Sequence, residues 1–294
     1  MPTQDVFSAK DIAERLDFFD DAAMKHYFLP VLTGRVMTFT KIASVAILSV
    51  LLLSFWQSWA HSTRGGEALS GQGWWSARRD SAGVAPDPVR WRDTAIVQVY
   101  AAPTYGWRGL VAVHPWIILK SKGETRYRRY EVISWGSDNV VRLNYTLPDG
   151  FWYGATPKLL VEHRGDAAQA MIPQIDEAIK RYPWPQTYRA WPGPNSNTFL
   201  AHIGREVPAL KLDMPANAIG KDYRAISNPV GLAPSGSGVQ VSVLGALGVT
   251  LALEEGVEIN LLGMNVGIDL NPPALRLPFI GRLGYDNVEQ QQER

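Results

Sequence analysis

The residues best suited to chemistry are a serine, a histidine and a glutamate that lie far apart in the chain. Ser196 follows Pro192-Gly193-Pro194, and apolar side chains then repeat at helical spacing, so we expect Ser196 at the start of a helix. The unpaired amides of a helix N-terminus can stabilise an anion or a developing oxyanion. Ser, Asn and Thr at this place also describe an ordinary capped helix. The role of Ser196 therefore depends on which groups the fold brings to it.

His114 and Glu131 are expected on adjacent strands of one hairpin. His114 interrupts an apolar run over 109–120, and residues 127–135 alternate as a returning strand. If the turn centres on Lys122-Gly123, His114 lies opposite Glu131, and a slip of one residue would place Tyr130 or Val132 there instead. A lone histidine on such a strand is often structural. A base oriented by a carboxylate, near a serine at a helix start, is the arrangement of acyl transfer. We predict that Ser196 is the nucleophile, His114 the base and Glu131 the group that orients it.

Polar and aromatic neighbours of these residues are candidate ligand contacts. Small polar side chains at the expected helix start can hydrogen-bond a ligand, and tryptophan suits sites that are part apolar and part wet. The histidines show no ligand spacing and the carboxylates are scattered, so neither a metal nor another cofactor is expected. The predicted binding residues are Asn195, Asn197, Thr198, Trp116 and Trp191.

The composition describes a folded protein with no strong charge. Of the 294 residues 46% are hydrophobic and 19% charged, and the net charge is +1. This balance gives no reason to expect a nucleic-acid partner. The chain has no cysteine, which excludes thiol catalysis and disulfides and says nothing firm about the redox compartment.

The N-terminal part predicts a membrane anchor. Residues 1–38 read as a helical segment that either rests on a membrane surface or stays solvated. Ile42 to Ala60 carries no charge and has the length of a membrane-spanning helix, so we place one transmembrane anchor at 39–61, with membrane lipid as its partner. A secretory signal peptide is the alternative. Positive residues are balanced across the run, and a signal-anchor arrangement places the C-terminal domain outside the cytoplasm.

The remainder predicts an α+β protein. Residues 62–92 form a tether and a Trp/Arg-rich segment, and 93–225 form a core in which an antiparallel, hairpin-rich sheet packs with two helices. One helix is expected over 166–182, and the other begins near Ser196. Residues 226–294 are expected to add a glycine-rich β-hairpin extension and a tail.

Two short motifs resemble a known enzyme group. Asn195-Ser196-Asn197-Thr198-Phe199 is similar to the Asn-Cys-x-x-Phe helix start of circularly permuted papain-like enzymes of the lecithin:retinol acyltransferase type. His114-Pro115-Trp116-Ile117-Ile118 and then Glu131 precede it in that group's order. The resemblance covers about residues 94 to 207 and implies a permuted papain-like fold that cleaves or transfers at an amide or ester bond. Ser196 stands where the group has cysteine, and a hydroxyl is much harder to ionise than a thiol.

The wider layout resembles an uncharacterised bacterial family of membrane-anchored proteins, catalogued as a domain of unknown function. This resemblance covers most of the chain and implies no established activity. With the signal-anchor orientation, the expected location is the bacterial inner membrane, with the C-terminal domain in the periplasm. The segments that carry it are Ala85-Pro86-Asp87-Pro88, Val97-Gln98-Val99-Tyr100, Tyr105-Gly106-Trp107-Arg108-Gly109, Trp191 to Phe199, Ala218 to Tyr223 and the glycine-rich end.

Together these observations predict a membrane-anchored, papain-like-fold hydrolase or acyltransferase that acts at the cell envelope. The alternative is a non-catalytic descendant of that fold, which binds a peptide, lipid or cell-wall ligand or serves as an assembly module. The relation between Ser196 and His114 in space separates these two functions.

Overall fold

The computed structural model describes residues 74–270 and 272–284, together with Lys41, Ser49, Leu52 and Trp56. The predicted helical segment 1–38, nearly all of the predicted anchor 39–61, the first part of the tether and the tail from residue 285 lie outside the described residues. Among the helices that the structure describes, none is long and apolar enough to cross a bilayer.

A five-stranded antiparallel sheet forms the first half of the described chain. Its strand order is β4-β3-β2-β1-β5. The two central strands, β1 and β2, are buried on both faces, and this explains why their sequences are almost continuous apolar runs. The strands are β1 (Ile96–Pro103), β2 (Val113–Lys120), β3 (Arg128–Val132), β4 (Val141–Leu143) and β5 (Lys158–Arg164).

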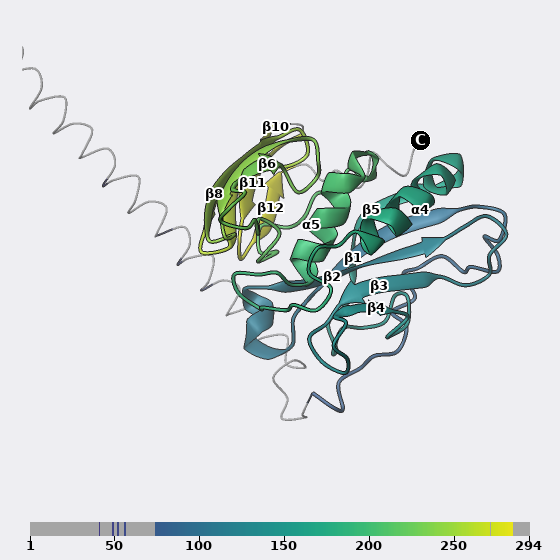
Figure 1. Ribbon diagram of the computed structural model, residues 1–294. Coiled ribbons are helices and arrows are strands. Elements are labelled where there is room, and N and C mark those ends of the chain that lie inside the picture. The colour runs from purple at the N-terminus through teal and green to yellow at the C-terminus, as the bar shows by residue number, and fades with distance from the viewer. Residues whose placement is uncertain are drawn as a thin grey trace, which may run out of the picture. The chain divides into compact units, whose positions relative to one another are not determined.

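Two α-helices cover one face of this sheet. Figure 1 shows α4 (Gly165–Lys180) and α5 (Ser196–Glu206) over the strands, and both helices pack against each other. Ile117 of β2, Ile175 of α4 and Phe199 of α5 are fully buried in the core between the layers. Both helices were expected from the sequence, and each is confirmed within a few residues of its predicted ends.

The opposite face of the sheet carries a second, aromatic core. Tyr100 and Trp116 stack with ring centroids 5.8 Å apart, and Trp152 packs beside them from the loop after β4. Loops cover this face instead of a helix. Its shape is therefore set by side chains that enter from several turns, among them the 3-10 helix η2 (Gly106–Leu110) before β2.

A second antiparallel sheet of seven strands follows. Its order, β12-β11-β10-β9-β8-β7-β6, is simply the reverse of the chain order, because tight turns join each strand to the next. The strands are β6 (Val230–Leu232), β7 (Gly238–Val243), β8 (Leu247–Ala252), β9 (Gly256–Leu261), β10 (Met264–Leu270), β11 (Pro273–Leu277) and β12 (Gly281–Gly284).

The predicted fold class is wrong. We expected an α+β protein with one antiparallel sheet, two helices and a hairpin extension in a permuted papain-like arrangement. The described residues are instead mostly β-structure, in two separate antiparallel sheets with two α-helices. The hairpins after residue 226 pair with one another, and no strand joins the first sheet, because seven successive hairpin strands satisfy one another's backbone groups.

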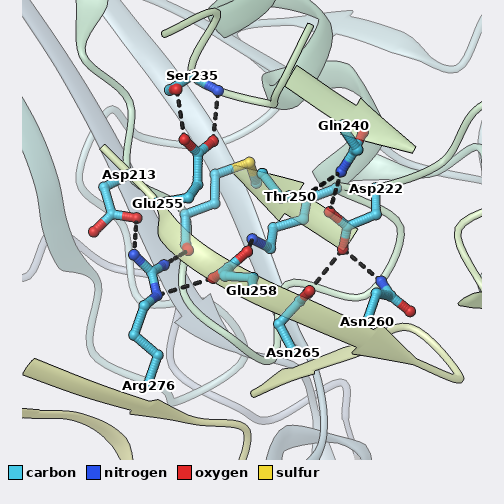
Figure 2. A network of polar contacts seen from close by, with 12 residues as sticks. Asp213, Asp222, Ser235, Gln240, Thr250, Glu255, Glu258, Asn260, Asn265 and Arg276 are labelled. Carbon is cyan, nitrogen blue, oxygen red and sulfur yellow. Dashed lines mark hydrogen bonds and ion pairs between the residues drawn. The ribbon is translucent and has the colours of Figure 1, made fainter. Parts of the chain in front are cut away.

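Ion pairs and amide hydrogen bonds fill the buried side of the seven-stranded sheet (Figure 2). The guanidinium of Arg276 on β11 lies 2.9 Å from Glu258 and 3.2 Å from Asp269. Lys221, in the loop before the sheet, pairs with the same Glu258. All four side chains are almost wholly buried, so each charge depends on its partners for the solvation that water would supply.

The buried position of Arg276 predicts a large loss of stability on its removal. Arg276→Met should lower the free energy of unfolding by about 3–5 kcal/mol, because it leaves buried carboxylates without their counter-ion. Arg181→Met removes an arginine whose 2.8 Å ion pair with Glu206 is exposed, and should cost about 1 kcal/mol or less. Urea unfolding of both variants measures the difference, and equal losses would contradict the role given to Arg276.

Candidate functional site

Asn195, and not Ser196, caps helix α5. The Asn195 side-chain oxygen accepts hydrogen bonds from the backbone amides of Asn197 (2.9 Å) and Thr198 (3.2 Å). The Asn195 amide in turn donates to the Thr198 hydroxyl at 3.1 Å, which completes a capping box. Ser196 is the first helical residue, and its own amide donates no hydrogen bond to any described residue. It is thus the one first-turn amide of α5 that has no partner within the described chain.

A short segment after α5, residues 218–223, holds this helix start in place; we call it the clamp. The carbonyl of Ile219 accepts hydrogen bonds from the side chains of Asn195 and Asn197, each at 2.9 Å. The carbonyl of Gly220 accepts one from the Thr198 hydroxyl at 2.7 Å. Gly220 has φ +94°, and a Cβ there would lie 2.5 Å from the Asn195 amide nitrogen. Only glycine fits this position without moving the cap.

His114, Glu131 and Arg129 form a buried chain of contacts. His114 Nε2 lies 2.9 Å from Glu131 Oε2, as the sequence predicted. Arg129 donates to both oxygens of that carboxylate, at 2.8 and 2.9 Å. The predicted register was two residues off, because β3 pairs with β2 through Ile118 and Arg129. Continuing this register places Glu131 opposite Trp116, so His114 reaches Glu131 diagonally.

The surroundings determine which nitrogen of His114 carries the proton. Burial alone would raise the pKa of Glu131, but the hydrogen bond from His114 and the charge of Arg129 hold this pKa below 4.5. Burial lowers the pKa of His114 below 6.5, although Glu131 partly opposes this shift. At neutral pH an ionised Glu131 therefore accepts the Nε2 proton of a neutral His114. Nδ1 is left as an unprotonated acceptor, and it forms no hydrogen bond within the described chain.

One tryptophan stacks on the His114 ring and a second lies behind the site. Trp152 stacks on the imidazole with centroids 3.7 Å apart and planes 9° from parallel. Trp116 is fully buried, donates its indole N–H to the Pro148 carbonyl at 2.8 Å and lies under the Arg129 guanidinium. Trp116 was predicted to contact a ligand. The structure places it behind the site, where it supports Arg129.

One cavity of about 710 Å³ has both His114 and Ser196 in its wall. Asn195, Asn197 and Trp191, which were predicted to bind a ligand, also line it. Thr198, Trp116 and Glu131 are not in the wall. Most of the remaining lining is apolar or aromatic: Trp74, Thr104, Tyr105, Trp107, Arg108, Val111, Ala112, Val113, Ile133, Trp135, Trp152, Tyr153, Tyr188, Ala190 and Ile219.

Ser196 and His114 form no hydrogen bond with each other in this structure. His114 lies on the same face of the sheet as Trp116, since strand side chains alternate, whereas α5 covers the face of Ile117. The two groups therefore reach the cavity from opposite sides of β2, at its first residues. A direct proton transfer needs the Ser196 hydroxyl and His114 within hydrogen-bond distance, and in this structure they are not.

Three features of the site were not anticipated from the sequence. Arg129 could have been found, because it lies two residues before Glu131 and so on the same face of the strand. Trp152 and the clamp carbonyls gave no such signal, since loops deliver them from distant parts of the chain. Within the described residues, no group of three or more His, Asp or Glu side chains could hold a metal ion.

A domain of unknown function covers residues 94–223: the chain matches there the family model described as Protein of unknown function (DUF3750). The matched range runs from β1 to the end of the clamp and contains His114, Glu131 and Ser196. It stops before the seven-stranded sheet. No curated protein matches the chain, and no solved structure does.

The capping box predicts that Asn195 is needed for stability. Asn195→Ala should lower the free energy of unfolding by about 1–3 kcal/mol, because the cap is lost and buried partners of its side chain are left unpaired. Asn139→Ala is a matched control, since Asn139 also accepts a backbone amide at 2.9 Å, from Val141, but in an exposed turn. Denaturant unfolding compares them, and an equal or smaller loss for Asn195→Ala would contradict the analysis.

The contact between Glu131 and His114 predicts the direction of a pKa change. The pKa of His114 should lie below 6.5 in the native protein and fall further in Glu131→Gln, because the carboxylate is the group that raises it. NMR titration of the imidazole measures both values. Glu124→Gln, on the far side of the hairpin turn, should leave the pKa of His114 unchanged. A rise in Glu131→Gln would show that the pair is wrongly assigned.

Proposed function

We propose that this protein is a hydrolase or acyltransferase that acts on an amide or ester bond, with Ser196 as nucleophile, His114 as base and Glu131 as the residue that orients the base. The observation that carries the proposal is one cavity whose wall contains Ser196, at a helix start, and His114 with Nδ1 free to accept a proton. The order of histidine, acidic residue and nucleophile, which resembles that of the lecithin:retinol acyltransferase type, also supports it.

The proposed reaction has two steps. The Ser196 hydroxyl oxygen bonds to the substrate carbonyl carbon, and its proton passes to Nδ1 of His114. The oxyanion lies at the α5 N-terminus, where the Ser196 amide can donate to it. The bond to the amine or alcohol then breaks, and that group leaves with the proton from His114. Water or an acceptor hydroxyl next attacks the acyl-Ser196 ester, with His114 again taking the proton. The bond from the acyl carbon to the Ser196 oxygen then breaks, His114 returns the proton to that oxygen, and the acid or the new ester leaves.

The cavity wall indicates the kind of substrate. Tyr105, Trp107, Trp135 and Trp191 offer large apolar surfaces, and Asn195, Ser196 and Asn197 form one polar end of the wall. An acyl or aromatic group would fill the apolar part and place its carbonyl at the polar end. The proposed site of action at the cell envelope rests on the uncharged run 42–60, nearly all of which lies outside the described residues.

A binding module is the second candidate. It is favoured by one specific observation, the absence of a hydrogen bond between Ser196 and His114. In that case the cavity would hold a peptide or lipid ligand, and Ser196 and Asn197 would only contact its polar end. Without a closing movement the imidazole could not take the serine proton, so the ligand would bind without being cleaved.

Reaction with a fluorophosphonate probe tests the enzymatic proposal. The full chain should acquire one adduct, which Ser196→Ala abolishes and His114→Gln slows by about 100-fold or more, because the base is lost. Ser137→Ala, in an exposed turn, is the matched serine control and should react like the wild type. A wild type that forms no adduct at Ser196 but still binds an apolar acyl ligand would refute the proposal that the protein is an enzyme. That result would support a binding module instead.

A further inference from the structure

The outward face of the seven-stranded sheet is a continuous aliphatic surface. The strand register aligns one row of side chains across all seven strands, and every member of this row is Val, Leu or Ile. Each is between 39% and 57% exposed. The row contains Leu232, Val239, Leu251, Val257, Ile268, Leu275 and Leu283.

Two further rows lie beside the first and have the same character. The second aligns Val230, Val241, Val249, Ile259 and Val266, and the third aligns Val243, Leu247, Leu261 and Met264. No polar side chain interrupts them. The positions between the rows point inward and are mostly polar or glycine, for example Gln240, Glu258 and Asn260. The sheet thus places its polar groups inside and its apolar groups outside, which is the opposite of a sheet that faces water.

We infer that this aliphatic face binds the same face of a second copy of the chain. Two sheets packed face to face form a sandwich about 10 Å thick, whose core is made of alternate aliphatic side chains such as these. A two-fold axis through the face makes the surface its own partner. The polar side already has its partners within the chain, in the network around Arg276, so a sandwich would cover the side of the sheet that no described residue covers.

The size of the face agrees with the needs of a stable dimer. The three rows together hold sixteen side chains, spaced about 4.8 Å across the strands and about 7 Å along them, so the face covers roughly 500 Å². Two copies would therefore bury about 1,000 Å², the size that separates specific interfaces from incidental contacts. A patch of this size is also at the upper limit of what a monomer leaves exposed.

The chemistry of the face favours a protein over a lipid surface. Membrane-binding surfaces combine apolar groups with interfacial Trp or Tyr and with Lys or Arg. The three rows contain none of these residues. The tryptophans of the described chain that are exposed lie elsewhere, several of them around the cavity. Val and Ile, which dominate the rows, pack well in the core of a sheet sandwich.

Cross-linking through an introduced cysteine tests this inference on the full chain. The protein has no cysteine, so Val249→Cys, in the central part of the face, provides a single reactive thiol. A bismaleimide with a flexible spacer should convert most of this variant to covalent dimer. Adding Ile259→Lys should reduce the dimer at least tenfold, because the charge is exposed in a monomer but buried in the sandwich. Val89→Lys, at an exposed valine away from the sheet, should leave the yield unchanged.

Two results would overturn the inference. The first is a dimer yield for Val249→Cys no higher than for Glu177→Cys, whose thiol lies on the exposed side of α4. The second is protection of the Val249→Cys thiol from a maleimide polymer by phosphatidylcholine–phosphatidylglycerol vesicles without dimer formation, which would assign the face to lipid. The inference does not depend on catalysis, and reaction at Ser196 is scored separately.

Discussion

The carbonyl oxygen of Ile219 accepts hydrogen bonds from two asparagine side chains, Asn195 and Asn197, and these residues begin helix α5. Three residues later, the Asp222 carboxylate accepts hydrogen bonds from Gln240, Asn260 and Asn265 of the second sheet (Figure 2). The clamp therefore joins the helix that carries Ser196 to the inner face of the seven-stranded sheet. Asn195, Asn197 and Asp222 are buried, so a shift of either partner would leave polar groups unpaired. The position of Ser196 thus depends in part on the seven-stranded sheet, which contributes no residue to the wall of the cavity.

The histidine is held by a different set of contacts. Burial makes the charged form of His114 unfavourable, and Glu131 alone would favour it. Arg129 shifts this balance, because it satisfies the Glu131 carboxylate and adds a positive charge near the imidazole. The ring is consequently neutral at physiological pH, and Trp152 holds its plane. A neutral imidazole with one nitrogen occupied is the form that a general base requires. The two halves of the site are each well ordered by their own contacts and meet only at the cavity wall.

Sequence patterns predicted the parts of this structure that depend on residues close together in the chain. Proline, glycine and small polar residues before Phe199 indicated a helix start, and the contact between His114 and Glu131 followed from the hairpin. The register was missed because the loop between β2 and β3 is longer than a tight turn. The second sheet was predicted only as a hairpin extension of the core. The alternation of apolar and polar residues in 239–261 indicates strands, but it does not show which strands pair with each other. The inverted polarity of this sheet became clear only when the register showed which side was covered. Trp152 and the clamp could not be predicted, because tertiary packing alone brings them to the site.

The central claim is that the neutral imidazole of His114 activates the hydroxyl of Ser196 inside this cavity. The pH dependence of the fluorophosphonate reaction rate tests it most directly. Since the pKa of His114 is lowered by burial, the rate should rise with pH to a plateau and reach half its maximum below pH 6.5, at the value that NMR gives for His114. The same rise should vanish in His114→Gln. A rate that depends on pH equally in the wild type and in His114→Gln, or a midpoint well above the pKa of His114, would contradict the account.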